Sequence, residues 1–416
     1  MGRFTSRIME PAALVNFSGF LDLFAVSMIM PLILPHARSL GASTTVAGIF
    51  GSTYGALQLF SSPVMGKWSD MVGRRASLIV TLGLTGCGYG IMGLSTSIFI
   101  MLLARIPGGI FKHSQNISKS YLADITSREK HSHVFGQFNA ASSFGFILGP
   151  MVGGHIAEWP GGFAVVGVLA CLTFFLNAAT MWLFLPAVTP SEHPETSPDK
   201  SPKSLKSTSG GYSFNIKEMV RSFRAINWDN LWDLFLIKFL GGFSVILFRS
   251  SFSLMSQSEF EASPRIIGYL TSYSGAVSTL CGLFVGRLAK YYDNDGKLYF
   301  HMVVLEVVTL FSLTVSPNLV WIAVLLCPLS IVTSVMRVMA TALTIHKGRD
   351  QDRGALMGFS QSIMSIARML APFVGGVAME FSPRGPLLIG TCAAALSLIL
   401  LILRPQGDET QKVKQS

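Results

Sequence analysis

Long runs of apolar residues alternate with short polar segments along the whole chain. Each run has about 20 residues and few charges, the length that an α-helix needs to cross the hydrocarbon core of a bilayer. The pattern predicts twelve such spans, over residues 12–35, 45–64, 76–95, 98–123, 135–157, 162–185, 231–256, 267–286, 299–316, 320–345, 355–379 and 386–403. Because β-barrel strands are shorter and alternate in polarity, we expect an all-α membrane protein.

The composition agrees with this prediction. Half of the 416 residues are hydrophobic and 13% are charged, which is unusually apolar for a soluble protein. The first apolar run follows directly on residues 1–10 and is too long for the core of a cleavable signal peptide. The five cysteines all fall inside predicted spans at unrelated spacings. They therefore predict neither a disulfide framework nor a metal site.

Lysine and arginine are unevenly distributed among the segments that connect the spans. If residue 1 is cytoplasmic, the segments on the opposite side carry only Arg38, Arg265 and Arg384. Since cytoplasmic loops are enriched in Lys and Arg, we expect both termini in the cytoplasm. The net charge of +10 then reflects topology, and no nucleic-acid partner is needed to explain it. The host membrane stays open between the plasma membrane and endolysosomal or other organellar membranes.

A polar segment rich in Pro, Ser and Lys separates the sixth span from the seventh and has too few apolar residues to fold alone. We expect four parts: a six-helix bundle over 1–186, a cytoplasmic linker over 187–229, a six-helix bundle over 230–404 and a cytoplasmic tail over 405–416. The bundles resemble each other, because GQFNAASSFGFILGPMVGG from Gly136 aligns with GFSQSIMSIARMLAPFVGG from Gly358. Two pseudo-symmetric bundles are typical of carriers that rock around a central site.

Two further stretches carry a family resemblance. The turn after the second span reads GKWSDMVGRR, and the fifth span contains GFILGPMVGG from Gly145. On these motifs, with FLDLFAVSMIMPLILPHARSLGAS in the first span and LLARIPGGI in the fourth, the chain resembles the tetracycline-resistance-type carriers of the major facilitator superfamily. The resemblance extends over nearly the whole chain. It implies a transporter with twelve helices in two bundles, and we expect it to work as a monomer.

The resemblance implies a gate at the cytoplasmic face. Its residues are expected to be Gly66, Asp70, Gly73, Arg74, Arg75 and Asp124. Asp70 would face the first turn of the eleventh span, where the helix dipole attracts an anion, and Arg74 would pair with Asp124. Anchoring of Arg75 to lipid headgroups is an equally good explanation for that residue. The corresponding turn of the second half, GRLAKYYDNDGKL, has Lys290 at the position that corresponds to Asp70, so no role is transferred to it.

The second motif is expected to bend the fifth and eleventh spans at the boundary between the bundles. Proline bends a membrane helix, and glycine lets a neighbouring backbone approach closely. The residues concerned are Gly145, Gly149, Pro150, Gly153, Gly154, Pro372, Gly375 and Gly376. Ordinary helix packing is the alternative explanation.

Ionisable residues inside the spans are mostly cationic. Arg105, Lys112 and Lys119 recur every seven residues, so on one continuous helix they would share a face. Such a cavity would attract anions. We therefore predict six substrate-binding residues, which are Arg105, Lys112, Lys119, Lys238, Arg249 and Arg337. Alternatively, Lys119 and Lys238 reach the headgroups, while Arg368 caps carbonyls beside Pro372 or joins the path.

Asp22 in the first span is the expected proton-coupling residue. A buried carboxylate can bind and release a proton when its surroundings change between two conformations. The alternative is a permanent ion pair between Asp22 and Arg105.

The sequence thus predicts a secondary active transporter of a small organic solute, preferably an organic anion, with proton coupling or exchange. One alternative is a proton-coupled exporter of cationic or zwitterionic drug-like molecules, and another is a non-transporting sensor or scaffold with a carrier fold. The sequence has no phosphate-binding loop, zinc-ligand spacing or nucleophile elbow. We therefore expect no enzyme, cofactor or metal site. The expected partners are the solute, protons and the lipid bilayer.

Overall fold

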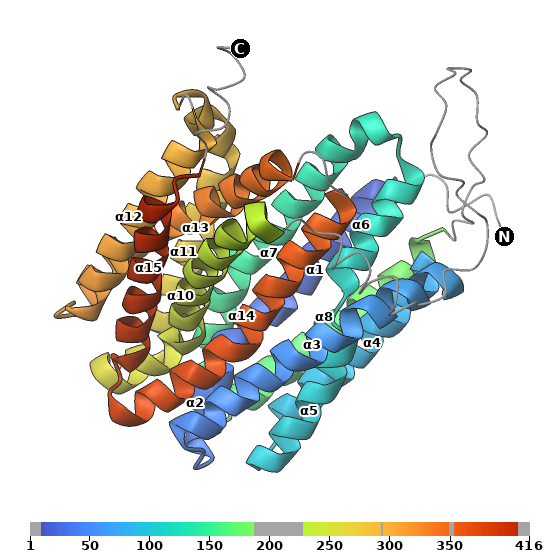
Figure 1. Cartoon of the computed structure of the whole chain (residues 1–416). Coiled ribbons are helices and arrows are strands. Elements are labelled where there is room, and N and C mark those ends of the chain that lie inside the picture. The colour runs from blue at the N-terminus through green and yellow to red at the C-terminus, as the bar shows by residue number, and fades with distance from the viewer. Residues whose placement is uncertain (1–9, 187–227, 293, 349–352, 407–416) are drawn as a thin grey trace, which may run out of the picture.

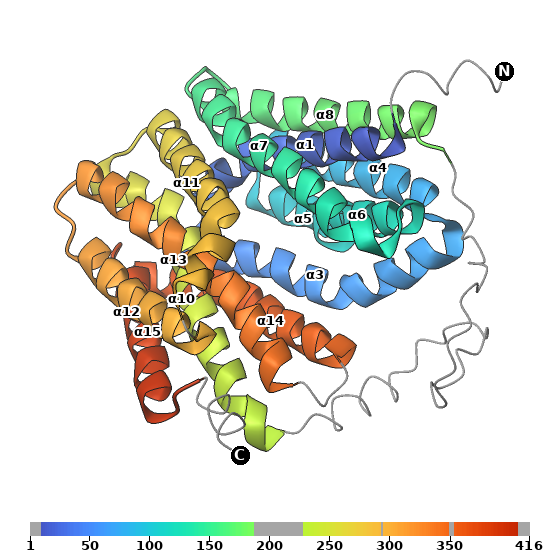
Figure 2. The same cartoon turned by 90° about the horizontal axis from the view of Figure 1, so that it is seen from above.

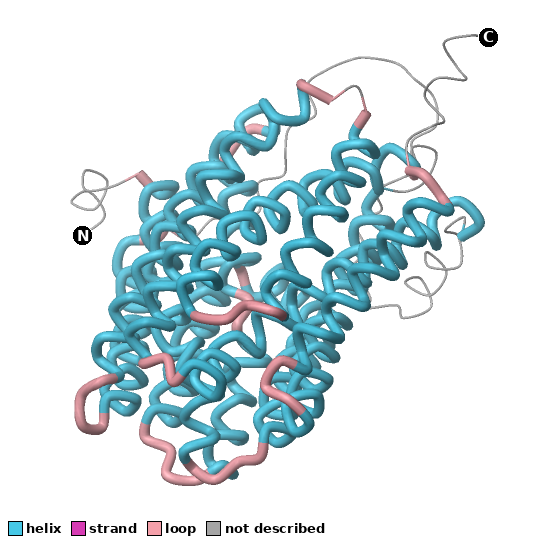
Figure 3. The backbone as a smooth tube through the Cα atoms, turned by 90° about the vertical axis from the view of Figure 1, so that its left-hand side faces the viewer, coloured by secondary structure: helices cyan, strands magenta, loops and turns pink. Residues whose placement is uncertain are grey.

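The computed structural model describes residues 10–186, 228–292, 294–348 and 353–406. These residues form helices joined by short loops, with no strand among them (Figure 3). The predicted linker and tail fall outside the described residues except at their ends, where the first helix of the second half already begins at Trp228.

The first half contains six spans. They are α1 (Pro11–Ile29) with η2 (Met30–Leu32) and α2 (Ile33–Ser39), α3 (Thr44–Val72), α4 (Arg74–Gly93), α5 (Ile98–Phe111) with α6 (Ser114–Ile125), α7 (His131–Ala157), which follows η3 (Arg128–Lys130), and α8 (Gly162–Phe184). The first and fourth spans are each interrupted. A 3₁₀ turn at Pro31 breaks the first, as expected where a proline removes a backbone donor.

The second half also contains six spans. They are α10 (Trp228–Phe260), α11 (Pro264–Lys290), α12 (Asp295–Thr314), α13 (Leu319–Lys347), α14 (Arg353–Phe381) and α15 (Gly385–Leu403). Nine helical segments of the described chain are long and apolar enough to cross a membrane. The other three spans are α3 and α5 with α6 in the first half and α11 in the second, and they are interrupted or richer in polar residues. The predicted all-α membrane fold with two six-helix bundles is confirmed.

The two halves meet along two helix pairs. α3 lies against α14, and α7 lies against α11 (Figures 1 and 2). We call the end of the bundle at Pro11, Phe184, Trp228 and Leu403 the termini end, and the opposite end the closed end. A side chain at Gly48 of α3 would meet the Pro372 carbonyl of α14, and one at Gly268 of α11 would meet the Pro150 carbonyl of α7.

Polar contacts between the halves also lie at the closed end. The Thr45 amide donates to Glu380 Oε1 over 3.1 Å, and the Tyr269 hydroxyl lies 3.4 Å from His155 Nδ1. None of the five ion pairs between described residues joins the two halves. This end is held by backbone packing and by these two hydrogen bonds, of which one involves a carboxylate. The halves can therefore separate there without breaking a buried ion pair.

Candidate functional site

A cavity of about 430 Å³ lies between the two halves, at their middle. α1, α3, α5 and α7 form one wall, and α10, α11, α13 and α14 form the other. Much of the lining is apolar, and it includes Met30, Leu34, Phe146, Phe248, Phe252, Leu326 and Leu329. A largely apolar cavity with a few polar groups is the usual form of a small-molecule site.

Three arginines from three helices are the charged groups of this cavity. They are Arg105 of α5, Arg249 of α10 and Arg368 of α14, and no carboxylate of the described chain lines the cavity with them. Polar neutral groups in the wall include the side chains of Tyr54 and Gln58 on α3. A confined cavity with three guanidinium groups and no acid holds anions and repels cations.

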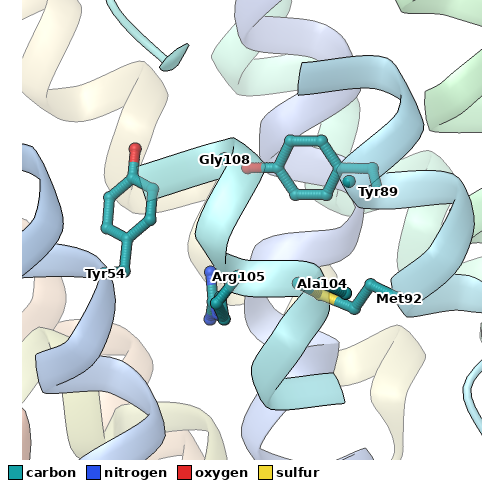
Figure 4. Close-up of a pocket in the computed structure, with 7 residues that line it drawn as sticks. Tyr54, Tyr89, Met92, Ala104, Arg105 and Gly108 are labelled. Carbon is teal, nitrogen blue, oxygen red and sulfur yellow. The ribbon is translucent and has the colours of Figure 1, made fainter. Parts of the chain in front are cut away.

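Arg105 is braced by aromatic rings. Its guanidinium carbon lies 4.4 Å from the centre of the Phe50 ring and 5.5 Å from that of Tyr54. Figure 4 shows Arg105 on α5 beside Tyr54 of α3, with Tyr89 and Met92 of α4 on the far side of the helix. Arg105 is 9% exposed, and its Nε is buried without a hydrogen-bond partner among the described residues. The aromatic contacts fix the side chain while leaving hydrogen-bond donors unused.

The other two arginines are less constrained. Arg368 Nη2 donates to Ser365 Oγ of its own helix over 3.0 Å. Arg249 is exposed to the cavity and has no hydrogen-bond partner among the described residues. The second half therefore offers cationic groups that a solute can engage without first breaking an ion pair.

Lys112 does not line this cavity, because the fourth span is broken beside it. α5 ends at Phe111 and α6 begins at Ser114, with Lys112 at φ −73°, ψ 64°. The prediction that Arg105, Lys112 and Lys119 share one continuous helical face is therefore wrong. Pro107 and the two glycines after it weaken this part of the helix.

Tertiary contacts hold the break open. Gln58 of α3 donates to the Lys112 carbonyl over 3.3 Å. His113 Nε2 lies 2.9 Å from Ser61 Oγ, which also donates to the Gly109 carbonyl over 3.2 Å. Side chains of α3 thus replace backbone hydrogen bonds that the interrupted helix has lost.

The ammonium group of Lys112 points to Asp22. Its Nζ lies 2.7 and 2.6 Å from the two carboxylate oxygens of Asp22. Ser114 Oγ donates to Asp22 Oδ1 over 2.9 Å, and Gln115 Nε2 donates to Oδ2 over 2.8 Å. Asp22 is 1% exposed and Lys112 is 8% exposed. The alternative of an Asp22–Arg105 pair is therefore wrong, since the broken helix presents Lys112 to α1 while Arg105 stacks on Phe50.

The other three cations predicted to bind substrate are not among the residues that line the cavity. Lys119 Nζ is 5.9 Å from the Phe138 ring centre of α7, within the first half. Lys238 donates to Ser360 of α14. Arg337 is an exposed residue of α13. Of the six cations predicted to bind substrate, the structure brings Arg105 and Arg249 to one cavity and adds Arg368 to them.

The motif after the second span forms a compact polar cluster at the termini end. Arg74 pairs with Asp70, and its Nε lies 3.1 Å from Asp124 Oδ2 as predicted. Arg75 donates to the Trp182 carbonyl of α8. Gly73 ends α3 at φ +94°, a conformation that L side chains rarely adopt.

Asp70 has no ion-pair partner among the described residues of the second half, and the side chains at the start of α14 lie outside the described part of the chain. Its side chain is 60% exposed, and its ion-pair partner among the described residues is Arg74. No neighbouring group lies within 4 Å of the position that a Cβ on Gly66 would take. The contact expected between Asp70 and the first turn of α14 therefore stays a prediction for another conformation.

The glycine motif divides into two sets with different contacts. Within the halves, a Cβ on Gly145, Gly149 or Gly153 would meet α1, and a Cβ on Gly375 would meet α10. Between the halves, Gly154 lies against Pro264 of α11, and Gly376 lies against Thr44 and Gly48 of α3. Glycines of the second set thus lie at the closed end, where the halves must part.

Sequence reasoning missed several residues of the site. Tyr54 and Gln58 line the cavity, and Ser114 and Gln115 bind Asp22. Neutral residues in an apolar span give no charge signal. The sequence Pro107-Gly108-Gly109 did contain a signal for the break, since it combines a missing donor with two weak helix formers.

Comparison with known proteins agrees with this architecture. The family model of the Major Facilitator Superfamily matches residues 15–254 and 234–416. Solute carrier family 22 member 18 of Mus musculus is 25% identical over 401 residues, covering 92% of this chain and 93% of the relative. Multidrug resistance protein 2 of Bacillus subtilis (strain 168) is 24% identical over 371 residues, covering 89% and 88%.

A solved structure has the same fold. The crystal structure of a human organic anion transporter superposes with a TM-score of 0.65 at 20% identity, covering 94% of this chain and 98% of that chain.

Proposed function

Because the chain belongs to the major facilitator superfamily of membrane transporters, we propose that it is a secondary active transporter of a small organic anion. The single observation that carries this proposal is the cavity between the halves, with Arg105, Arg249 and Arg368 in an otherwise mostly apolar wall. Such a wall suits a solute with an apolar body and at least one anionic group. The likeness to a human organic anion transporter supports the same direction.

The conformation fits one state of an alternating-access cycle. From the positive-inside rule we infer that the termini end faces the cytoplasm. The polar contacts between the halves lie at the closed end, and at the termini end no described residue of the second half pairs with Asp70. The structure then corresponds to a carrier that faces the cytoplasm. In the opposite state, Asp70 would approach the first turn of α14.

Proton coupling through Asp22 is part of the proposal. Asp22 is buried and paired with Lys112 beside the break in the fourth span. Protonation of Asp22 would remove the charge partner of Lys112, whose backbone carbonyl accepts from Gln58, a residue that lines the cavity. The break in the fourth span thus links proton binding at Asp22 to solute binding in the cavity, so the two can compete.

Flux in sealed proteoliposomes tests this function. The panel contains organic anions such as sulforhodamine and matched cations such as ethidium, with and without an imposed pH gradient. The variants are Arg249→Gln and Arg105→Gln, with Arg287→Gln as control, because Arg287 is an exposed residue near the termini end. Loss of one charge-assisted contact, about 1.5–3 kcal/mol, should raise the KM for anions roughly 10- to 100-fold.

Other outcomes favour the alternatives. Cation flux that survives Arg249→Gln and disappears in Asp22→Asn would favour the drug exporter. An absence of flux for every compound, from protein whose melting is cooperative, would favour the sensor or scaffold. Anion flux that Arg249→Gln and Arg287→Gln reduce equally would contradict the cavity as the binding site.

A further inference from the structure

The second half buries a carboxyl group that the transport site does not use. Glu306 of α12 is 0% exposed. It lies where α10, α13 and α15 converge, because its side chain, Met336 and Ser397 all surround the position that a Cβ on Gly241 would take. Ser244, one turn beyond Gly241 on α10, contacts its carboxyl group.

No cation balances Glu306 within the described part of the chain. The ion pairs of this half join Lys347 to Asp233 and Arg384 to Glu259. An ionised carboxylate in an apolar interior is very costly unless a cation and several hydrogen bonds compensate for it. Glu306 therefore differs from the other buried acids of the described chain, Asp22 and Asp233, each of which has a lysine partner.

The helices around Glu306 direct their charges elsewhere. On α10, Lys238 donates to Ser360 of α14, and Arg249 faces the cavity. On α13, Arg337 is exposed, and α15 has no charged residue between Gly385 and Leu403. The titratable neighbour of Glu306 is Tyr299, a buried residue of its own helix, within electrostatic range.

The hydrogen count at Ser244 indicates where a proton lies. Ser244 Oγ is 2.7 Å from the Gly241 carbonyl and 2.5 Å from Glu306 Oε1. A serine hydroxyl has one hydrogen, whereas a carbonyl and an ionised carboxylate both only accept. Both contacts are hydrogen bonds when Glu306 carries a hydrogen on Oε1 and donates it to Ser244, which donates to Gly241. Oε2, which has no hydrogen-bond partner among the described residues, is then an uncharged carbonyl oxygen.

We propose that Glu306 is a proton-binding site of the second half and is protonated in this conformation. The site is separate from the cavity and from Asp22. Loss of the proton would leave a buried charge with one hydrogen bond from Ser244, so the junction of α10, α12 and α15 would have to rearrange or admit water. α10 also carries Arg249, hence proton release at Glu306 would act on the cavity wall.

The protonation state can be tested without a transport measurement. Coupling to the cavity rests on the proposed function, but the proton itself does not. The experiment compares infrared spectra of the purified full chain at neutral pH for the wild type and Glu306→Gln. The matched control is Glu259→Gln, because Glu259 is ion-paired with Arg384. We expect Glu306→Gln to remove a carbonyl band of a protonated carboxylic acid and Glu259→Gln to remove carboxylate bands alone.

Ser244→Ala provides a second variant that retains the acid. It should shift the protonated carbonyl band, because Glu306 loses its hydrogen-bond partner. The proposal is overturned if Glu306→Gln removes carboxylate bands alone, or if Ser244→Ala shifts no protonated band. It is also overturned if sodium raises the melting temperature of the wild type and not of Glu306→Gln, since the site would then hold a metal cation.

Discussion

The most deeply buried carboxyl group described in each half is Asp22 in the first and Glu306 in the second, and the two have opposite surroundings. Asp233, the other buried acid of the second half, is paired with Lys347. Asp22 in the first half receives an ammonium group, a hydroxyl and an amide. Glu306 in the second half contacts one hydroxyl, and its Oε2 has no hydrogen-bond partner in the part of the chain that the structure describes. The pseudo-symmetry of the bundles thus does not extend to the surroundings of these two acids.

The comparison separates two ways of keeping an acid inside a membrane protein. Asp22 can remain ionised, because its charge is balanced and both oxygens are bonded. Glu306 avoids the cost of burial when it is neutral. Removing a charge partner should therefore damage the first half severely, whereas replacing the acid by its amide should hardly affect the second.

The largest effect is expected from Lys112→Met. The substitution leaves the Asp22 charge buried without a cation, which typically costs about 3–5 kcal/mol. We expect a much lower melting temperature for the purified protein. The double variant Asp22→Asn/Lys112→Met should recover most of the loss, because it removes both charges. If the double variant melts no higher than Lys112→Met, the ion pair is not the cause.

The fold could be predicted from the sequence because its signals are local. Apolar run length predicts each span, and the spacing of Gly145, Gly149 and Gly153 predicts close packing, which α1 provides. The Arg74–Asp124 pair was predicted through the family resemblance. Such features depend on residues near each other in sequence or on a shared motif.

The site could be predicted less well because it depends on distant contacts. Whether Lys112 faces the cavity or Asp22 is decided by a helix break that Gln58 and Ser61 of α3 stabilise. A seven-residue spacing carries no information about such a break. The protonation of Glu306 depends likewise on which helices meet around it, and composition does not specify that.

Gly376→Ala tests the contact between the halves. A methyl group there would press on Thr44 and Gly48 of α3, and overpacking typically costs about 1–3 kcal/mol. It should disfavour the packing of the closed end. In an alternating-access cycle, opening of the closed end accompanies closure of the termini end. The distance between spin labels at Lys67 and Lys290, near the termini end of each half, should therefore shorten.

The control for this substitution is Gly83→Ala. Gly83 lies on α4, and nothing is within 4 Å of the position that its Cβ would take. An equal change in the distance distribution for both variants would show that Gly376 has no special role in holding the halves together.

A smaller difference is expected between two arginine-to-lysine variants of the cavity. Arg105 stacks on Phe50 and Tyr54, and an ammonium group loses the planar stacking surface. Cation–π contacts contribute about 0.5–2 kcal/mol, so Arg105→Lys should lower anion affinity several-fold. The Arg249 guanidinium has no cation–π contact among the described residues, so Arg249→Lys should change affinity less. Equal effects on KM would show that the stacking does not position Arg105.

The smallest effect on stability is expected from Glu306→Gln. Glutamine has the shape of the protonated acid and can donate to Ser244. The free energy of unfolding at neutral pH, measured through the melting temperature, should therefore change by less than about 1 kcal/mol. Asp22→Asn is the contrasting variant, since it leaves Lys112 charged and unpaired. Because the folded chain holds the Glu306 proton while the unfolded chain releases it, raising the pH should destabilise the wild type until Glu306 also ionises in the folded state, and Glu306→Gln should lack this contribution. If Glu306→Gln lowers the melting temperature as much as Asp22→Asn, the two halves bury their acids in the same ionised form, and the contrast between them is lost.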